Sequence, residues 1–128
     1  DGIVDDFKVR LQSAIANMSP AKFEQFSRAL LTKMGVQFTN KGIQISNNTA
    51  PVSEPEINQF LGAMNKFQAD YGVFITNSRF TNKAREAARE GTPITLIDGN
   101  DLIRLVIKYE LFITPVTTYV LDDFYLDE

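Results

Sequence analysis

The sequence predicts an α/β domain in which a central mixed β-sheet is flanked by helices. Three observations carry this prediction. Segments with apolar residues at helical spacing alternate along the chain with short apolar runs bounded by turn residues. One of these runs, Gly72–Thr76, lacks polar alternation, which is typical of a central strand covered on both faces. The 128 residues, 44% of them hydrophobic, suffice for one domain with a sizeable core.

Two helices are predicted before any strand. Apolar residues at helical spacing indicate a leading helix over residues 5–17. Ser19 is placed to cap a second helix, with Pro20 at its first position. Gly35 is placed to end that helix, and an apolar stripe between these residues makes it one of the two clearest amphipathic helices in the chain.

A β-hairpin is predicted next. Val36–Phe38 and Ile43–Ile45 both alternate apolar and polar residues, as half-buried strands do. Asn40-Lys41-Gly42 between them has the composition of a tight turn. We therefore expect two short strands joined by this turn, followed by a loop at residues 47–51.

A second clear amphipathic helix follows the loop. Ser53 and Glu56 have the Ser-x-x-Glu spacing of a capping box, which predicts a helix that runs to about Asp70. Gly62 inside this helix indicates close packing against another backbone. After the strand Gly72–Thr76, the sequence predicts a helix capped by Thr81 and closed by Gly91, a strand over Pro93–Ile97 and a last helix over Leu102–Tyr109.

The predicted elements form a single domain over residues 1–128 with three parts. These are a leading helix (1–18), a core (19–109) and an extended C-terminal tail (110–128) that is expected to lie along the body. The chain has neither a signal peptide nor an apolar run long enough to cross a bilayer, so we expect a cytoplasmic location. It does not begin with Met, and we expect it to be part of a longer protein.

The composition excludes several kinds of chemistry. With no Cys and no His there is no disulfide, no thiolate zinc site and no imidazole base. Catalysis would therefore rest on carboxylates, Lys, Tyr, amides, hydroxyls or an oxygen-bound metal such as Mg²⁺. The net charge of −3 argues mildly against nucleic-acid binding. Between Asp6 and Asp122, however, all 13 Lys and Arg residues stand against nine acids, which leaves room for a basic face.

A cluster of cations follows the predicted central strand. Four positive charges lie within eleven residues, at Arg79, Lys83, Arg85 and Arg89. They predict phosphate contacts beside the strand end, where α/β sheets bind ligands. The alternative is a solvated helix face with ordinary ion pairs, which we favour for Lys83.

Hydroxyl groups at the end of the same strand are further candidates. Thr76 and Ser78 can donate hydrogen bonds to phosphate. The alternative, which we favour, is that they satisfy backbone groups of the turn.

Four segments together resemble the Mrr-type catalytic domain of the PD-(D/E)XK nuclease superfamily. Gly72–Thr81, with the alanines that follow it, and Ile94–Gly99 with Leu102 are similar to the end of that domain. Met18–Glu24 is similar to its opening helix, and Glu54–Ala63 to a later helix. The resemblance implies a restriction-endonuclease-like core around the central sheet.

The resemblance also implies a function. It is that of a Mg²⁺-dependent DNA endonuclease in a restriction system, with modified, such as methylated, DNA as a target. Glu24 stands where the family has an acid on its first helix, which implies a catalytic or metal-linked role; the alternative is an exposed carboxylate near a helix N-terminus. A homodimer is expected because cleavage of both strands usually requires two active sites. A DNA-recognition domain is expected N-terminal to Asp1.

The chain departs from the family at its catalytic centre. The family places a glycine-rich stretch with a metal-binding Asp, then a strand ending in Gln-x-Lys, ahead of the Ser53 helix. This chain instead runs from Ile43–Ser46 through Asn47 and Asn48 into a loop, so the catalytic segment is missing near residues 46–49.

Two readings of this departure stay open. Either the printed sequence omits a segment of the protein, or the domain has lost its catalytic centre. We favour omission, because losing a central strand should leave the helices poorly covered. The alternative function is a catalytically inactive DNA-binding or assembly module on the same fold. A small-ligand α/β domain has little support, because no glycine-rich phosphate loop is present.

Overall fold

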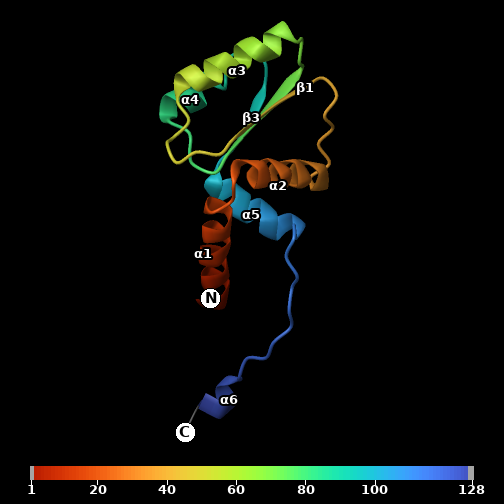
Figure 1. Cartoon of the computed structure of the whole chain (residues 1–128). Helices are drawn as coiled ribbons and strands as arrows, with labels where there is room; N and C mark the ends of the chain where they lie inside the picture. Colours follow the sequence, from red (N-terminus) through yellow and green to blue (C-terminus); the bar gives the residue numbers. More distant parts are fainter. Residues whose placement is uncertain (1, 127–128) are drawn as a thin grey trace.

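The computed structural model describes residues 2–126 of the chain. Helices and strands alternate through most of it (Figure 1). In chain order the elements are α1 (Gly2–Ala16), α2 (Pro20–Lys33), β1 (Lys41–Ser46), α3 (Glu54–Lys66), β2 (Tyr71–Thr76), α4 (Asn82–Ala87), β3 (Ile94–Ile97), α5 (Gly99–Tyr109) and α6 (Asp123–Leu126). Among these described helices, none is both long and apolar enough to cross a membrane.

The three strands form one sheet in the order β1-β2-β3. Both pairings are parallel, with Gln44 opposite Phe74 and Phe74 opposite Leu96. The α/β class and the central position of β2 are therefore confirmed. The sheet of the described residues is purely parallel rather than mixed, because α3 and α4 return the chain to the same end of the sheet before each new strand.

The predicted β-hairpin is wrong. Residues 36–38 form no strand, and β1 pairs with β2 instead. The turn itself exists: Asn40 has a positive φ of 58°, and its carbonyl accepts a hydrogen bond from the Asp70 amide at 2.9 Å. The turn therefore precedes β1 and is hydrogen-bonded to the segment ahead of β2. Residues 36–38 alternate apolar and polar side chains but pair with no strand.

Helices cover both faces of the sheet (Figure 1). The α1, α2 and α5 helices lie on one face, and α3 and α4 lie on the other. Alternate residues of β2 point to opposite faces: Val73 and Ile75 join the first core, whereas Phe74 joins the second. Each core contains fully buried side chains, such as Phe23 on one face and Ile57 on the other. The faces of α2 and α3 that meet the sheet are therefore covered by the three described strands alone.

Close packing occurs at two sheet glycines rather than at Gly62. Nothing lies within 4 Å of a Cβ built on Gly62, which is exposed. A Cβ on Gly72 would overlap the Met64 sulfur and lie 3.0 Å from Cε2 of Phe60, and one on Gly42 would lie 2.6 Å from Cγ of Met64. The α3 helix therefore approaches the sheet closely only because these strand positions lack side chains.

Gly72→Ala is expected to destabilise the domain. The added methyl forces the buried Met64 and Phe60 to shift, and overpacking of this kind costs about 1–3 kcal/mol. The free energy of unfolding in urea measures the effect. Gly62→Ala is the matched control, because it adds a methyl to an open helix position and should stabilise by about 0.5–1 kcal/mol. Equal destabilisation by both changes would contradict this account.

The C-terminal tail does not lie along the body, as the sequence suggested it would. Leu111 is the last buried residue, and beyond it the chain runs away from the helices to the short α6 (Figure 1). The large apolar side chains of the tail are exposed, among them Tyr119 at 95% and Phe124 at 81%. Ile113 is the last residue that packs against the core, so the body ends there and the described part of the tail beyond it is exposed.

Candidate functional site

The carboxyl ends of the three strands meet at one edge of the sheet. Ser46 at the end of β1 lies opposite Thr76 at the end of β2, and Ile97 at the end of β3 lies opposite Ile75. The loops that follow these strands therefore lie together. Open α/β sheets bind ligands at this edge, so it is the candidate functional site of the domain.

Amide and hydroxyl groups, rather than carboxylates, join the loops after β1 and β2. The Asn77 amide donates to Oδ1 of Asn47 at 2.6 Å, and its own Oδ1 accepts from the Asn48 backbone at 3.0 Å. The Asn48 amide donates to Oγ of Ser46 at 2.9 Å, and that of Asn47 donates to the Met18 carbonyl at 3.3 Å. These bonds close the junction after β1 and join the two loops through uncharged groups.

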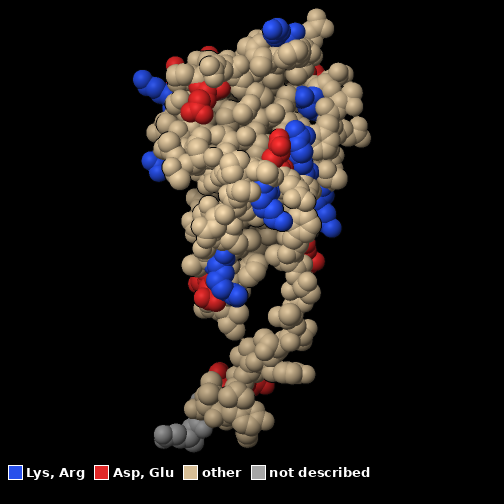
Figure 2. All heavy atoms as spheres, viewed as in Figure 1, with Lys and Arg blue, Asp and Glu red and all other residues tan. Residues whose placement is uncertain are grey.

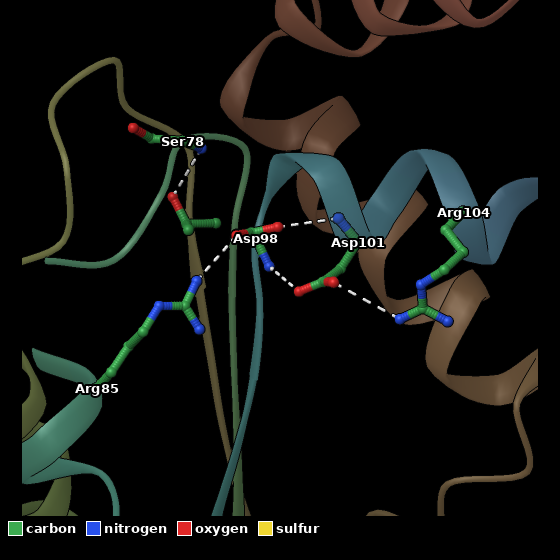
Figure 3. Close-up of polar contacts among 6 residues, drawn as sticks. Ser78, Arg85, Asp98, Asp101 and Arg104 are labelled. Carbon is green, nitrogen blue, oxygen red and sulfur yellow. Dashed lines mark hydrogen bonds and ion pairs between the residues drawn. The ribbon is translucent and has the colours of Figure 1, made fainter. Parts of the chain in front are cut away.

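Thr76 and Ser78 have structural roles in this network. Thr76 is fully buried, and its Oγ1 accepts the Ser78 backbone N–H at 3.1 Å (Figure 3). Ser78 donates its own hydroxyl to the Thr49 carbonyl at 3.3 Å. Thr76 therefore has the turn-stabilising role that the sequence favoured over phosphate contact, and its side chain has no access to solvent. Ser78 is only partly exposed and already has a partner.

Glu24 lies on α2 beside the end of β1. It lines a shallow cavity of about 310 Å³ together with Ile45 and Asn47. Its side chain is 57% exposed, and the nearest cation is Arg28, one turn further along the helix at 3.7 Å. This geometry is that of a solvated carboxylate with a weak helical ion pair. The position predicted from the sequence is thus near the candidate site, but no second acid accompanies it there.

Beside the end of β1, the residues of this edge offer a magnesium ion one carboxylate, that of Glu24. Mg²⁺ in nucleases is held by carboxylates that converge on one point. Within residues 2–126, no group of three Asp, Glu, His or Cys side chains is placed to hold a metal. The groups nearest to Glu24 across the cavity belong to Asn47, Ile45, Pro20 and Ala21, none of which is charged.

Arg85 is held within the fold by two contacts. Its Nη2 lies 3.0 Å from Oδ2 of Asp98, whose side chain is only 13% exposed (Figure 3). Its guanidinium also stacks over Phe80 at 5.6 Å. Asp98 in turn caps α5 by accepting from the Asp101 amide at 2.9 Å. Arg85 therefore joins α4 to the start of α5, and it has an ion-pair partner that the other three predicted cations lack among the described residues.

The three remaining predicted cations are exposed. Arg79, Lys83 and Arg89 form no ion pair within the described part of the chain. Arg79 follows β2 directly, and the other two lie on or just beyond α4. On the face in Figure 2, Lys and Arg side chains are spread over the body with acids among them, so no single basic patch dominates that face.

The domain is an α/β domain, with a parallel sheet covered by helices. Polar loops lie at the carboxyl edge of this sheet, where open α/β sheets bind ligands. The family model for the catalytic domain of Mrr restriction endonucleases matches residues 39–106. The chain therefore belongs to this restriction endonuclease family. The match includes all three strands and leaves out α2, which carries Glu24.

A curated relative supports the same assignment. The type IV methyl-directed restriction enzyme EcoKMrr of Escherichia coli K12 is 37% identical to this chain over 81 residues. Those residues are 63% of this chain but only 26% of the relative, so the matched part spans about a quarter of that enzyme. No solved structure gives a significant match.

One feature of β1 was missed in the sequence. The strand runs parallel to β2 and is joined to it through α3, so it directly precedes the helix that begins after Ser53. The resemblance places the strand ending in Gln-x-Lys at that point. Here the strand ends in Gln44-Ile45-Ser46. Gln44 lies two residues before the end of β1 and ahead of the Ser53 capping box. This spacing could have identified β1 as the strand that ends in Gln-x-Lys in the family.

Proposed function

We propose that this domain binds DNA within a restriction system and does not hydrolyse it. One observation carries the proposal: amide and hydroxyl groups occupy the sheet edge where metal-dependent hydrolysis needs converging carboxylates. Membership of the restriction endonuclease family supports DNA as the ligand. Of the two functions that the sequence left open, the geometry favours the catalytically inactive module.

The end of β1 supports the same conclusion. When the strand is aligned with the family pattern, Ser46 stands where the family has lysine. A serine hydroxyl carries no positive charge, so it cannot neutralise the charge that develops on a scissile phosphate. The hydroxyl of Ser46 also accepts a hydrogen bond from Asn48. The cation of the usual centre is thus replaced by a neutral group, and Glu24 is the one carboxylate beside it among the residues that line the cavity at the end of β1.

We assign DNA contact to Arg79, Lys83 and Arg89, which are exposed and follow the sheet edge. Contacts of this kind are made to phosphates and carry no sequence information. A preference for modified DNA would therefore come from base contacts in another part of the protein. The match covers about a quarter of the length of EcoKMrr, which leaves room in that relative for such a further domain.

Binding of a fluorescently labelled duplex tests this proposal. Three phosphate contacts should give an affinity that falls with salt, with a slope of log K against log salt of about −2.7. The same slope is expected for duplexes of unrelated sequence. Absence of binding at low salt would contradict the proposal.

The competing function is Mg²⁺-dependent cleavage, which the resemblance implies. Family membership and the nearness of Glu24 to the end of β1 favour it. A cleaving enzyme would require Glu24 for its activity. In an inactive DNA-binding module, replacement of Glu24 would change neither DNA binding nor cleavage. Plasmid cleavage in the presence of Mg²⁺, compared between the wild type and Glu24→Ala, separates the two functions.

A further inference from the structure

The surface between α1 and α5 is hollowed into an apolar groove. Val9, Ile103 and Ile107 line this α1–α5 groove, which has a volume of about 480 Å³. Lys8 and Arg104 also line it, so basic side chains accompany an apolar lining. Val9 is 63% exposed, so the groove is open to solvent in the single chain. Such a surface suits a short segment that combines apolar and acidic residues.

The C-terminal tail has that composition. From Leu111 onward the sequence has no Lys or Arg and four acids, of which Asp122 and Asp123 flank the apolar side chains of α6. The large apolar residues of the tail are Val116, Tyr119, Val120, Leu121, Phe124, Tyr125 and Leu126, all more than 60% exposed. A contiguous exposed set of this kind marks an interaction segment rather than a simple end of the chain.

The groove and the tail are complementary and both are unoccupied in the single chain. Lys8 has no ion-pair partner among the described residues, and neither Asp122 nor Asp123 has one. The tail leaves the body at the end of α5, and α6 lies apart from α1 and α5 (Figure 1). A second copy of the chain supplies a tail that can enter the groove from outside.

We propose that two copies of this chain assemble by exchanging tails, so that residues 114–126 of each copy fill the α1–α5 groove of the other. The aromatic side chains of α6 cover Val9 and Ile103, and the flanking acids face Lys8 and Arg104. The arrangement is self-complementary, as a two-fold dimer requires. It uses neither the sheet edge nor the three exposed cations, so it stands independently of the proposed DNA binding.

Charge reversal in trans tests the exchange. The groove variant carries Lys8→Glu and Arg104→Glu, and the tail variant carries Asp122→Lys and Asp123→Lys. Each alone places like charges in both contacts and should raise the dimer dissociation constant at least about tenfold. An equimolar mixture of the two restores opposite charges in both contacts. Sedimentation velocity of the full chain should show a dimer for the wild type, mainly monomer for each variant and a dimer again for the mixture.

A control variant separates the exchange from a general effect of net charge. Lys22→Glu with Lys66→Glu changes the charge as the groove variant does, but on exposed positions elsewhere, and should leave the dimer intact. Circular dichroism checks that each variant is folded. A monomeric wild type would overturn the proposal. The same holds if the chain is monomeric and its tail resists proteolysis, since the tail would then occupy the groove of its own chain. A mixture that stays monomeric, or variants that both dimerise like the wild type, would overturn it as well.

Discussion

A chain in which Arg79, Lys83 and Arg89 are all replaced by alanine is expected to lose most of its affinity for duplex DNA. Each phosphate contact releases condensed counterions, and losing three should lower the salt slope by about 2.7 units and the affinity on the order of a hundredfold at low salt. The three side chains are exposed and make no ion pair within residues 2–126, so their removal should not disturb the fold. Fluorescence anisotropy over a salt series measures both quantities.

The matched control removes the same charge elsewhere. Lys33, Lys66 and Lys108 are exposed in the last turns of α2, α3 and α5, and their joint replacement by alanine gives the same net charge. It should leave the salt slope nearly unchanged, since those residues lie away from the loop after β2. Equal losses in both triple variants would mean that DNA responds to the total charge of the chain, which would contradict the assigned contacts.

Phe23→Ala is expected to cost the domain a large part of its stability. Phe23 is fully buried in the core between α2 and the sheet, and truncation of a buried Phe costs about 3–5 kcal/mol. A domain of this size is stable by roughly 5–15 kcal/mol, so the unfolding midpoint in urea should fall sharply. The result bears on the fold directly, because α2 lies outside the family match and its core role comes from the structure.

Phe67→Ala provides the comparison for this change. Phe67 follows α3 and is 78% exposed, so its truncation should alter stability by no more than about 0.5 kcal/mol. Similar midpoints for the two variants would show that Phe23 is not part of the core, and that α2 does not cover the sheet as described.

Elements specified by local chemistry could be predicted from the sequence. Ser19 caps α2 by accepting the Lys22 amide at 3.1 Å, and Ser53 with Glu56 forms the predicted capping box of α3. The apolar run of β2 identified the central strand, because burial on both faces leaves no polar alternation. These signals lie within a few residues of the structure they determine.

Features that depend on distant partners could not be predicted. The strand partner of Gln44 is Phe74, thirty residues away, and local alternation gave no information about it. Asp98 is 13 residues from Arg85, and the two meet only because the fold brings α4 close to the end of β3. The neutral network around Asn77 likewise joins loops that the sheet aligns. The sequence therefore located the candidate site but not the partners that decide which side chains are free.

Plasmid cleavage tests the central claim, that this domain has a restriction endonuclease fold without a working metal centre. The full chain is incubated with supercoiled plasmid and Mg²⁺ at low salt, and the products are separated on an agarose gel. We expect retarded but uncut plasmid, identical for the wild type and for Glu24→Ala. Nicked or linear DNA that requires Mg²⁺ and disappears with Glu24→Ala would contradict the claim and establish a functional nuclease.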